Sequence, residues 1–250
     1  MTVHPRAAVG FGRATGAYER GRPGYPAEMV DWLCDRVGVG AGRRVLDLAA
    51  GTGKLTRTLV PTGVTLVAVD PVHAMLRALR TMTGGTVPAV AATAQALPLA
   101  DRSVDGIVVA QGFHWFATNA ALAEMTRVLR PGGAIALVWN VRRLDDPVQA
   151  AISEIVDPYR GDTPSHTTGH WREVVEHSNT VGIRDTTTVG HDVTSDIDGL
   201  VDRIVSISFI AALPAGERAV VQHRVRALEA VTGATPVLRY RCEGYVLTPR

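Results

Sequence analysis

The sequence predicts an α/β fold built around a doubly wound, parallel β-sheet. From residue 43 to residue 140, short runs rich in Val, Ile, Leu and Ala alternate with stretches of helical periodicity. The apolar runs show no in–out alternation, which is typical of strands that helices bury on both faces. Strands that alternate with helices in this way are joined by right-handed crossovers, and such crossovers produce a doubly wound sheet.

The elements up to residue 140 follow from local patterns. A helix is expected at Ala27–Val37, because Pro26 has the fixed φ that suits the start of a helix. The run Pro131-Gly132-Gly133 ends the last helix of this region. The expected strands are Arg43–Leu48, Val64–Asp70, Pro88–Thr93, Val104–Ala110 and Ala134–Trp139, and the helices between them are Lys54–Val60, Val72–Met82 and Asn119–Leu129.

Beyond residue 140 the pattern changes. Prolines and a tract of Ser, Thr, His and Gly separate two expected helices, 148–157 and 171–177, which indicates a helical lid inserted after the fifth strand. A sixth strand (Asp185–Val193), two helices (Ser195–Ile207 and Ala215–Val231) and a last strand (Tyr240–Leu247) are expected to follow. We therefore divide the chain into an N-terminal segment (1–42), a core (43–140), a lid (141–182) and a segment that completes the sheet (183–250).

Composition excludes several classes of protein. The 250 residues carry 26 basic and 24 acidic side chains, a balance that argues against a nucleic-acid partner. Lys54 is the only lysine, and such an excess of arginine is typical of a GC-rich bacterial genome. Two cysteines, Cys34 and Cys242, cannot build a disulfide framework. No apolar run approaches the roughly 20 residues that cross a bilayer. We expect a cytoplasmic protein without a membrane partner.

The first strand runs into a turn of small residues that opens directly into a helix. Gly51 and Gly53 permit positive φ and allow a ligand to approach the backbone. Asp70 ends the second strand, and an acid there can accept hydrogen bonds from both hydroxyls of a ribose. A glycine turn alone is also common in tight strand–helix connections, but the turn and the acid together predict a nucleoside ligand.

The details of this turn argue against a dinucleotide. The third glycine of the G-x-G-x-x-G pattern is replaced by Thr56. Asp47 precedes the turn, where its charge would repel a pyrophosphate but would tolerate an ammonium group. An NAD(P)-dependent oxidoreductase is therefore kept only as a minor alternative.

At this point the chain resembles a known family. The segments VLDLAAGTGKLT (45–56), HAML (73–76), TAQALPL (93–99), DRSVD (101–105) and LRPGG (129–133) are similar, in order and spacing, to motifs of class I S-adenosyl-L-methionine-dependent methyltransferases. The segments 18–26 and 112–116 most resemble a small-molecule branch that includes trans-aconitate-type methyltransferases. Ala49 departs from the family, which usually has a glycine there; alanine is tolerated if that residue keeps a negative φ.

The resemblance implies a fold, a cofactor and a set of contacts. The fold is a mostly parallel, seven-stranded, Rossmann-like sheet whose last strand is antiparallel. The cofactor is S-adenosyl-L-methionine, and the product is S-adenosyl-L-homocysteine. The implied contacts are Asp47, Ala49 and Gly51 at the methionine end, Gly53 in the same cofactor-binding turn, Asp70 at the ribose, Pro71 and Met75 near the adenine, Ala94 and Gln95 at its edge, and Gln111 near the methionine part and the transferred methyl group.

The acceptor end offers fewer signals. A carboxylate needs no base to accept a methyl group, whereas a phenol or an amine uses one. His114 is the candidate base; alternatively, His114 and Trp115 form a wall that orients the acceptor. Tyr18 and Arg22 either belong to a segment that closes over the cofactor, with Arg22 binding a carboxylate of the cofactor or of the acceptor, or lie on a surface arm. The pair Arg142-Arg143 either binds an anionic acceptor through Arg142 or is a solvated surface pair.

The expected activity is methylation of a small organic acceptor at a carboxylate or hydroxyl oxygen. The tetrapeptide that methylates exocyclic amines of nucleic acids is absent after the fourth strand, where Gln111-Gly112-Phe113-His114 stands. His166, His170 and His177 lack the spacing of a metal site, so no metal is expected. A catalytically inactive protein that binds S-adenosyl-L-methionine is the main alternative.

Overall fold

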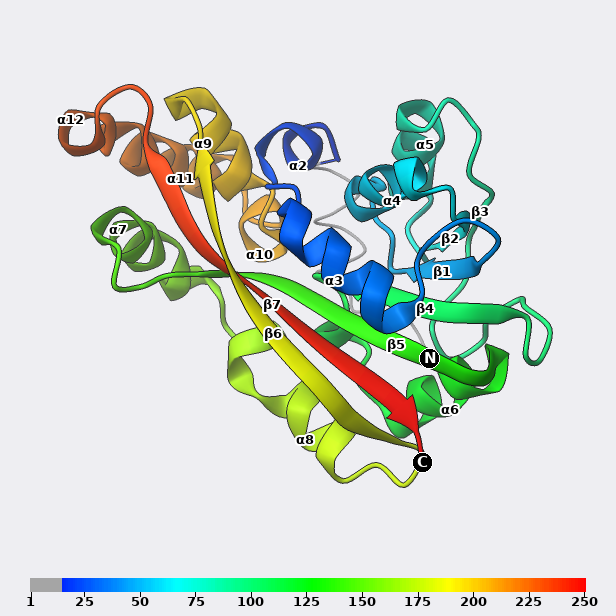
Figure 1. The fold of residues 1–250 in the computed structure, drawn as a ribbon. Helices are drawn as coiled ribbons and strands as arrows, with labels where there is room; N and C mark the ends of the chain where they lie inside the picture. Colours follow the sequence, from blue (N-terminus) through cyan, green and yellow to red (C-terminus); the bar gives the residue numbers. More distant parts are fainter. Residues whose placement is uncertain (1–14) are drawn as a thin grey trace.

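A seven-stranded sheet of order β3-β2-β1-β4-β5-β7-β6 forms the centre of the molecule (Figure 1). The computed structural model describes residues 15–250. Strand β7 lies between β5 and β6 and is antiparallel to both, whereas β1 to β5 pair in parallel. This confirms the doubly wound, mostly parallel sheet and its antiparallel last strand. The strands are β1 (Arg44–Leu48), β2 (Thr65–Val69), β3 (Ala89–Val90), β4 (Val104–Ala110), β5 (Leu129–Arg142), β6 (Val181–Thr194) and β7 (Val237–Pro249).

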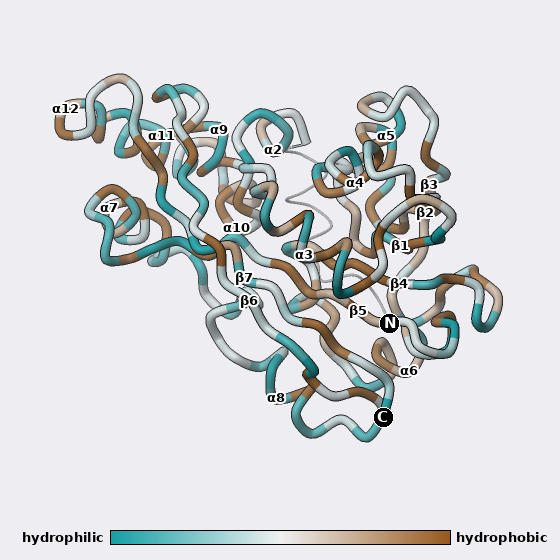
Figure 2. Tube along the Cα trace, viewed as in Figure 1, coloured by the Kyte–Doolittle hydropathy of each residue, from teal (hydrophilic) through white to brown (hydrophobic). Residues whose placement is uncertain are grey.

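Helices cover both faces of the sheet. The first core cluster packs Ile107 and Val109 of β4 against α6 (Asn119–Val128) and α8 (His170–Glu176). The second packs Val108 against α3 (Ala27–Val37), α4 (Lys54–Leu59) and α5 (His73–Met82). Successive residues of β4 therefore enter opposite cores, which explains why its sequence is apolar without alternation. Figure 2 shows the hydrophobic colour concentrated on the central strands.

Two sheet elements differ from the expected ones. The strand expected at Pro88–Thr93 is only two residues long, because β3 is an edge strand that pairs with β2 alone. Strand β5 already begins at Leu129, which pairs with Val104 before the register shifts around the glycine turn. The helix expected at Ala215–Val231 is divided into α11 (Ala215–Ala227) and α12 (Glu229–Thr232).

A helical cap stands at one end of the long strands β6 and β7 (Figure 1). It comprises α7 (Pro147–Val156), α9 (Ile197–Val205), α10 (Ser208–Ala211) and α11, whose apolar side chains share one core. Helix α7 precedes β6, whereas α9 to α12 follow it. The cap therefore draws on two separate segments of the chain, and the helix α8 of the segment 141–182 packs under the sheet instead.

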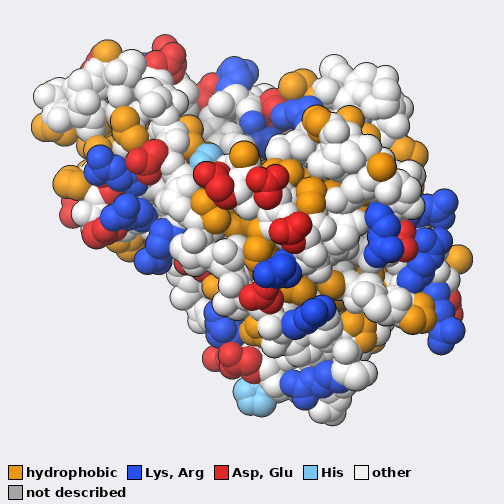
Figure 3. All heavy atoms as spheres, in the orientation of Figure 1, with side chains coloured by type: hydrophobic (Ala, Val, Ile, Leu, Met, Phe, Trp, Pro, Cys, Tyr) orange, Lys and Arg blue, Asp and Glu red, His pale blue; other side chains and the backbone are white. Residues whose placement is uncertain are grey.

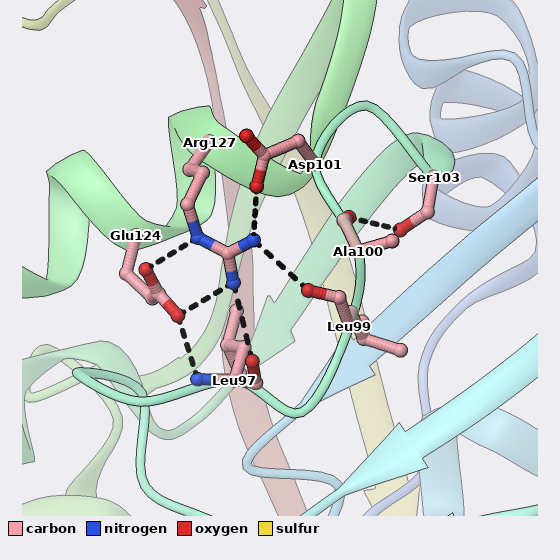
Figure 4. Close-up of polar contacts among 7 residues, drawn as sticks. All are labelled: Leu97, Leu99, Ala100, Asp101, Ser103, Glu124 and Arg127. Carbon is pink, nitrogen blue, oxygen red and sulfur yellow. Dashed lines mark hydrogen bonds and ion pairs between the residues drawn. The ribbon is translucent and has the colours of Figure 1, made fainter.

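An arginine holds the loop between β3 and β4 (Figure 4). Arg127 of α6 donates to the carbonyl oxygens of Leu97 (3.2 Å) and Leu99 (2.9 Å). It also pairs with Glu124 (2.7 Å) and Asp101 (2.6 Å). This network ties the loop that carries Ala94 and Gln95 to the helix behind the sheet.

The outer features of the described residues are unexceptional. Acidic and basic side chains both occur across the face in Figure 3. No helix within residues 15–250 is long and apolar enough to span a membrane. Over the same residues, no group of three or more His, Cys, Asp or Glu side chains is arranged to hold a metal ion.

Candidate functional site

The carboxyl ends of β1 and β4 meet at the point where the strand order reverses, which is where α/β sheets place ligands. Ala49 (φ 58°) follows β1 and Gln111 (φ 59°) follows β4, and both are non-glycine residues in the left-handed region. The condition under which alanine was expected to be tolerated, a negative φ at residue 49, is therefore not met. A side chain is accommodated because the neighbouring Gly112 has none: a Cβ on Gly112 would lie 2.8 Å from the Cβ of Ala49. Such strain is typical of functional sites.

Two positions of the turn require glycine, for different structural reasons. Gly51 (φ 57°) and Gly53 (φ 82°) both adopt left-handed conformations. A Cβ on Gly53 would also lie 2.9 Å from Cγ of Leu79 in α5. The turn thus brings α4 and α5 close together and leaves the backbone at Gly51 accessible beside the hydroxyl of Tyr18.

Asp70 fixes the turn to the end of β2. Its carboxylate accepts hydrogen bonds from the backbone N–H of Gly51 (2.9 Å) and of Val72 (2.8 Å). Burial raises the pKa of Asp70 to about 6, and the two amide donors oppose that rise. Each carboxylate oxygen can accept more than one hydrogen bond, so Asp70 keeps capacity for the hydroxyls of a ligand.

Asp47 has an oxygen that the protein leaves unsatisfied. The side chain is buried, and Oδ2 accepts a hydrogen bond from Oγ1 of Thr56 at 2.5 Å. Oδ1 is buried without a hydrogen-bond partner among the described residues. Burial raises the pKa of Asp47 to about 7. A ligand cation beside Oδ1 would satisfy this oxygen and stabilise its ionised form.

Helix α2 (Thr15–Gly21) lies over this turn and connects it to the cap. Glu19 forms ion pairs with Arg57 and with Lys54 of α4, the latter at 3.6 Å. Arg20 pairs with Asp202 of α9 at 2.6 Å. The structure therefore places the start of the described chain over the crevice rather than on a free surface arm. The part of the predicted N-terminal segment before Thr15 lies outside the described residues.

The predicted residues gather around two connected hollows. The strand-end crevice is lined by a set that includes Tyr18, Arg22, Asp47, Ala49 and Gln111. The cap cavity, of about 280 Å³, is lined by Tyr18, Arg22, Gln111, His114, Trp115 and Arg142, together with residues of the cap. Asp70, Gly51 and Gly53 shape the turn beside the crevice. Pro71, Met75, Ala94 and Gln95 line neither hollow; Met75 and Ala94 are buried.

Several lining residues were missed by sequence reasoning. Asn140 and Arg203 line both hollows, and His166 lines the cap cavity. Arg203 is only 8% exposed and lies between Leu200 and Ile204 on the buried side of α9. An arginine at an apolar position of an amphipathic helix was the available signal for it.

His114 lines the cavity with a defined protonation state and tautomer. Nε1 of Trp139 donates a hydrogen bond to Nδ1 of His114 at 3.2 Å. Burial, reinforced by neighbouring positive groups, lowers the pKa of His114 to about 3. A neutral imidazole whose Nδ1 accepts a hydrogen bond carries its proton on Nε2. The free nitrogen of His114 is thus a donor, which favours the orienting role over that of a general base.

Arg22 and Arg142 bring positive charge into the same space. Arg22 donates to Oγ and to the carbonyl oxygen of Ser206, at 3.0 and 3.1 Å. Burial lowers the pKa of Arg22 to about 9 and that of Arg142 to about 10. Arg143, by contrast, is half-exposed and pairs with Asp145 at 2.5 Å. The structure therefore separates the two residues of the pair and directs only Arg142 to the cavity.

Several known proteins are similar to this chain in sequence or in fold. The family model described as a methyltransferase domain matches residues 46–137. An uncharacterised methyltransferase of Mycobacterium tuberculosis is 42% identical over 227 residues, which cover 88% of this chain and 86% of that protein. An uncharacterised methyltransferase-like protein of Schizosaccharomyces pombe is 40% identical over 158 residues, 63% of this chain and 61% of that protein. A solved structure from Anaeromyxobacter dehalogenans, described as a candidate type II methyltransferase, matches with a TM-score of 0.67 at 24% identity, over 91% of this chain and 97% of that one.

Proposed function

Since the chain belongs to the class I S-adenosyl-L-methionine-dependent methyltransferase family, we propose that it transfers a methyl group from S-adenosyl-L-methionine to an oxygen of a small organic acceptor. The observation that carries this proposal is the continuity of the strand-end crevice with the cap cavity. Tyr18, Gln111 and Asn140 line both, so a group bound beside Gln111 faces the cavity. A volume of about 280 Å³ lies near the lower end of small-molecule sites, which hold roughly 300–1,000 Å³.

Residues of the crevice and of the turn beside it fit the cofactor. The unpartnered Oδ1 of Asp47 suits the ammonium group of its methionine part. Asp70, with oxygens that can accept further hydrogen bonds, suits the ribose hydroxyls. Pro71, Met75, Ala94 and Gln95 are proposed to contact the adenine. When bound, S-adenosyl-L-methionine supplies a methyl group on a positively charged sulfur, which is already activated for displacement.

The state of His114 bears on which oxygen is methylated. Because Nδ1 of His114 accepts from Trp139, its one basic lone pair is engaged and is not directed at an acceptor hydroxyl. Its Nε2–H can instead donate to an acceptor oxygen and orient it. A carboxylate is already ionised at neutral pH and needs only to be aligned and kept from water. These groups therefore favour a carboxylate over a hydroxyl.

Calorimetry with S-adenosyl-L-methionine and S-adenosyl-L-homocysteine tests the proposal. We expect micromolar binding of both, followed by methyl transfer from labelled cofactor to members of a panel of small organic acids. Asp47→Asn should weaken cofactor binding, whereas Asp192→Asn, at an exposed site on β6, should not. The absence of binding to both compounds overturns the proposal. Binding without transfer to any acceptor supports an inactive cofactor-binding protein, and binding of NAD(P) in their place supports the oxidoreductase.

A further inference from the structure

The cap cavity contains guanidinium nitrogens that the protein does not satisfy. Nη1 of Arg142 and both Nε and Nη1 of Arg203 are buried, and none has a hydrogen-bond partner among the described residues. A buried charge without a partner destabilises the folded state, and most proteins pair such groups. The presence of two such arginines in one cavity indicates that a bound ligand supplies the missing hydrogen-bond acceptors.

Charge in the cavity is strongly unbalanced. Four arginines line it, namely Arg22, Arg142, Arg160 and Arg203, against the single carboxylate of Asp157. Asp157 already pairs with Arg160 at 2.7 Å. The pKa values of Arg22 and Arg142 are lowered by burial and by Arg203, so these cations repel one another across the cavity. An anion would relieve both the desolvation and the repulsion.

The arginines are held where an anion can meet them together. Arg22 is fixed by Ser206, and Oγ of Ser206 in turn donates to the carbonyl oxygen of Arg203 at 2.8 Å. Arg142 approaches from the end of β5. Three segments far apart in the sequence thus present arginine donors to one space, and Arg22 is already held in place before an anion binds.

Position along β5 separates Arg142 from the methylation point, whereas Arg22 and Arg203 line both hollows. Asn140 lines both the crevice and the cavity, whereas Arg142 lines only the cavity. Alternate residues of a strand are separated by roughly 7 Å. A group held by Arg142 is therefore not the group that lies at the junction beside Gln111.

We propose that Arg142 and Arg203, assisted by Arg22, form an anion subsite that binds a carboxylate or phosphate of the acceptor remote from the oxygen that is methylated. This inference rests on the proposed function and specifies its substrate class: small acids with two anionic groups. Transfer to the first carboxylate forms an O–CH₃ bond, breaks the S–CH₃ bond and releases a neutral thioether. That carboxylate becomes a neutral ester, while the second anionic group stays on the arginines.

The test uses the full chain saturated with S-adenosyl-L-homocysteine. Acetate, malonate, glutarate and inorganic phosphate are titrated calorimetrically into wild type, Arg142→Met and Arg143→Met. Arg143 is the matched control, because it neighbours Arg142 but is half-exposed and paired with Asp145. A dicarboxylate should bind wild type at least about tenfold more tightly than acetate, since hydrogen bonds to charged groups are the stronger class. Arg142→Met should remove that gain, and Arg143→Met should keep it.

Two further readouts keep the test decisive. Arg142→Met should raise the melting temperature of the ligand-free protein, because it removes a buried unpaired charge; an arginine with a merely structural role would lower it. Failure of S-adenosyl-L-homocysteine to bind wild type overturns the proposed function. Normal binding of that compound, with dicarboxylates and phosphate no tighter than acetate or insensitive to Arg142→Met, overturns the subsite alone. Preference for phosphate over both dicarboxylates, lost in Arg142→Met, supports the subsite and identifies its anion as a phosphate.

Discussion

The strand-end crevice and the cap cavity share Arg22, Arg203, Gln111 and Asn140 but differ in the charged groups that each has alone. Asp47 lines only the crevice, and Asp70 lies in the turn beside it. On the cavity side, arginines predominate. Carboxylates suit a cationic ligand and arginines suit an anionic one, which is consistent with the proposal that Asp47 faces the cofactor and Arg142 faces the acceptor. The comparison teaches that charged groups found in only one hollow, such as Asp47 in the crevice and Arg142 in the cavity, distinguish the site proposed for the cofactor from the site proposed for the acceptor.

The variant with the largest expected effect weakens cofactor binding at the turn beside the crevice and should leave the cap cavity unchanged. Asp70→Ala removes the acceptor for the amides of Gly51 and Val72, leaving two buried donors unsatisfied. We expect at least a hundredfold weaker binding of S-adenosyl-L-homocysteine and a loss of about 2–4 kcal/mol in the free energy of unfolding. Calorimetry and urea denaturation measure the two. Asp70→Asn, which keeps one acceptor oxygen, is the control and should fall between; equal binding by all three proteins would contradict the assignment.

The second prediction concerns the strained junction. Gly112→Ala places a Cβ 2.8 Å from that of Ala49, and such overpacking costs about 1–3 kcal/mol. Adding Ala49→Gly should recover most of that loss, because it removes the colliding atom and the left-handed alanine at φ 58°. Denaturation of the two single variants and the double variant measures the coupling. Additive effects would show that the two strand ends are energetically independent.

The third prediction uses the raised pKa of Asp47, about 7. A carboxyl whose folded-state pKa lies above its unfolded value stabilises the protein below the unfolded value, near 3.8, and that contribution is lost as pH rises through about 7. Cofactor binding has the opposite sign, because an ammonium group needs the ionised form. The affinity for S-adenosyl-L-homocysteine should therefore increase up to about tenfold from pH 6 to pH 8.

Asp47→Asn isolates this effect. The variant cannot ionise, so its affinity for S-adenosyl-L-homocysteine should stay flat over the same pH range, and its stability should decline less as pH rises. Calorimetry and denaturation at pH 6, 7 and 8 provide both curves. A slope that persists in Asp47→Asn would assign the titration to another group, with Asp70 the first candidate because its pKa is about 6.

The same two regions show what sequence reasoning can reach. Strands β1 and β4 were predictable because both of their faces are buried. Asp47 and Asp70 could be singled out because each lies at the carboxyl end of an apolar strand. The cap cavity was less accessible, since Asn140, His166 and Arg203 come from segments brought together only by packing. The side chain of Ala49 was not predictable for a related reason: its Cβ fits only because Gly112, more than sixty residues away, has no side chain.

The smallest expected effect concerns His114 and distinguishes an orienting role of this side chain from that of a general base. If His114 orients the acceptor through Nε2–H, His114→Gln keeps an amide donor and should lower kcat by no more than about tenfold with any acid that the transfer assay identifies. Loss of a general base costs typically 10²–10⁴-fold. The kcat–pH profile of wild type should also lack an ionisation assignable to His114 above pH 5, since the pKa of His114 lies near 3. A thousandfold loss in His114→Gln, with S-adenosyl-L-homocysteine binding intact, would instead make His114 the base and favour a hydroxyl acceptor.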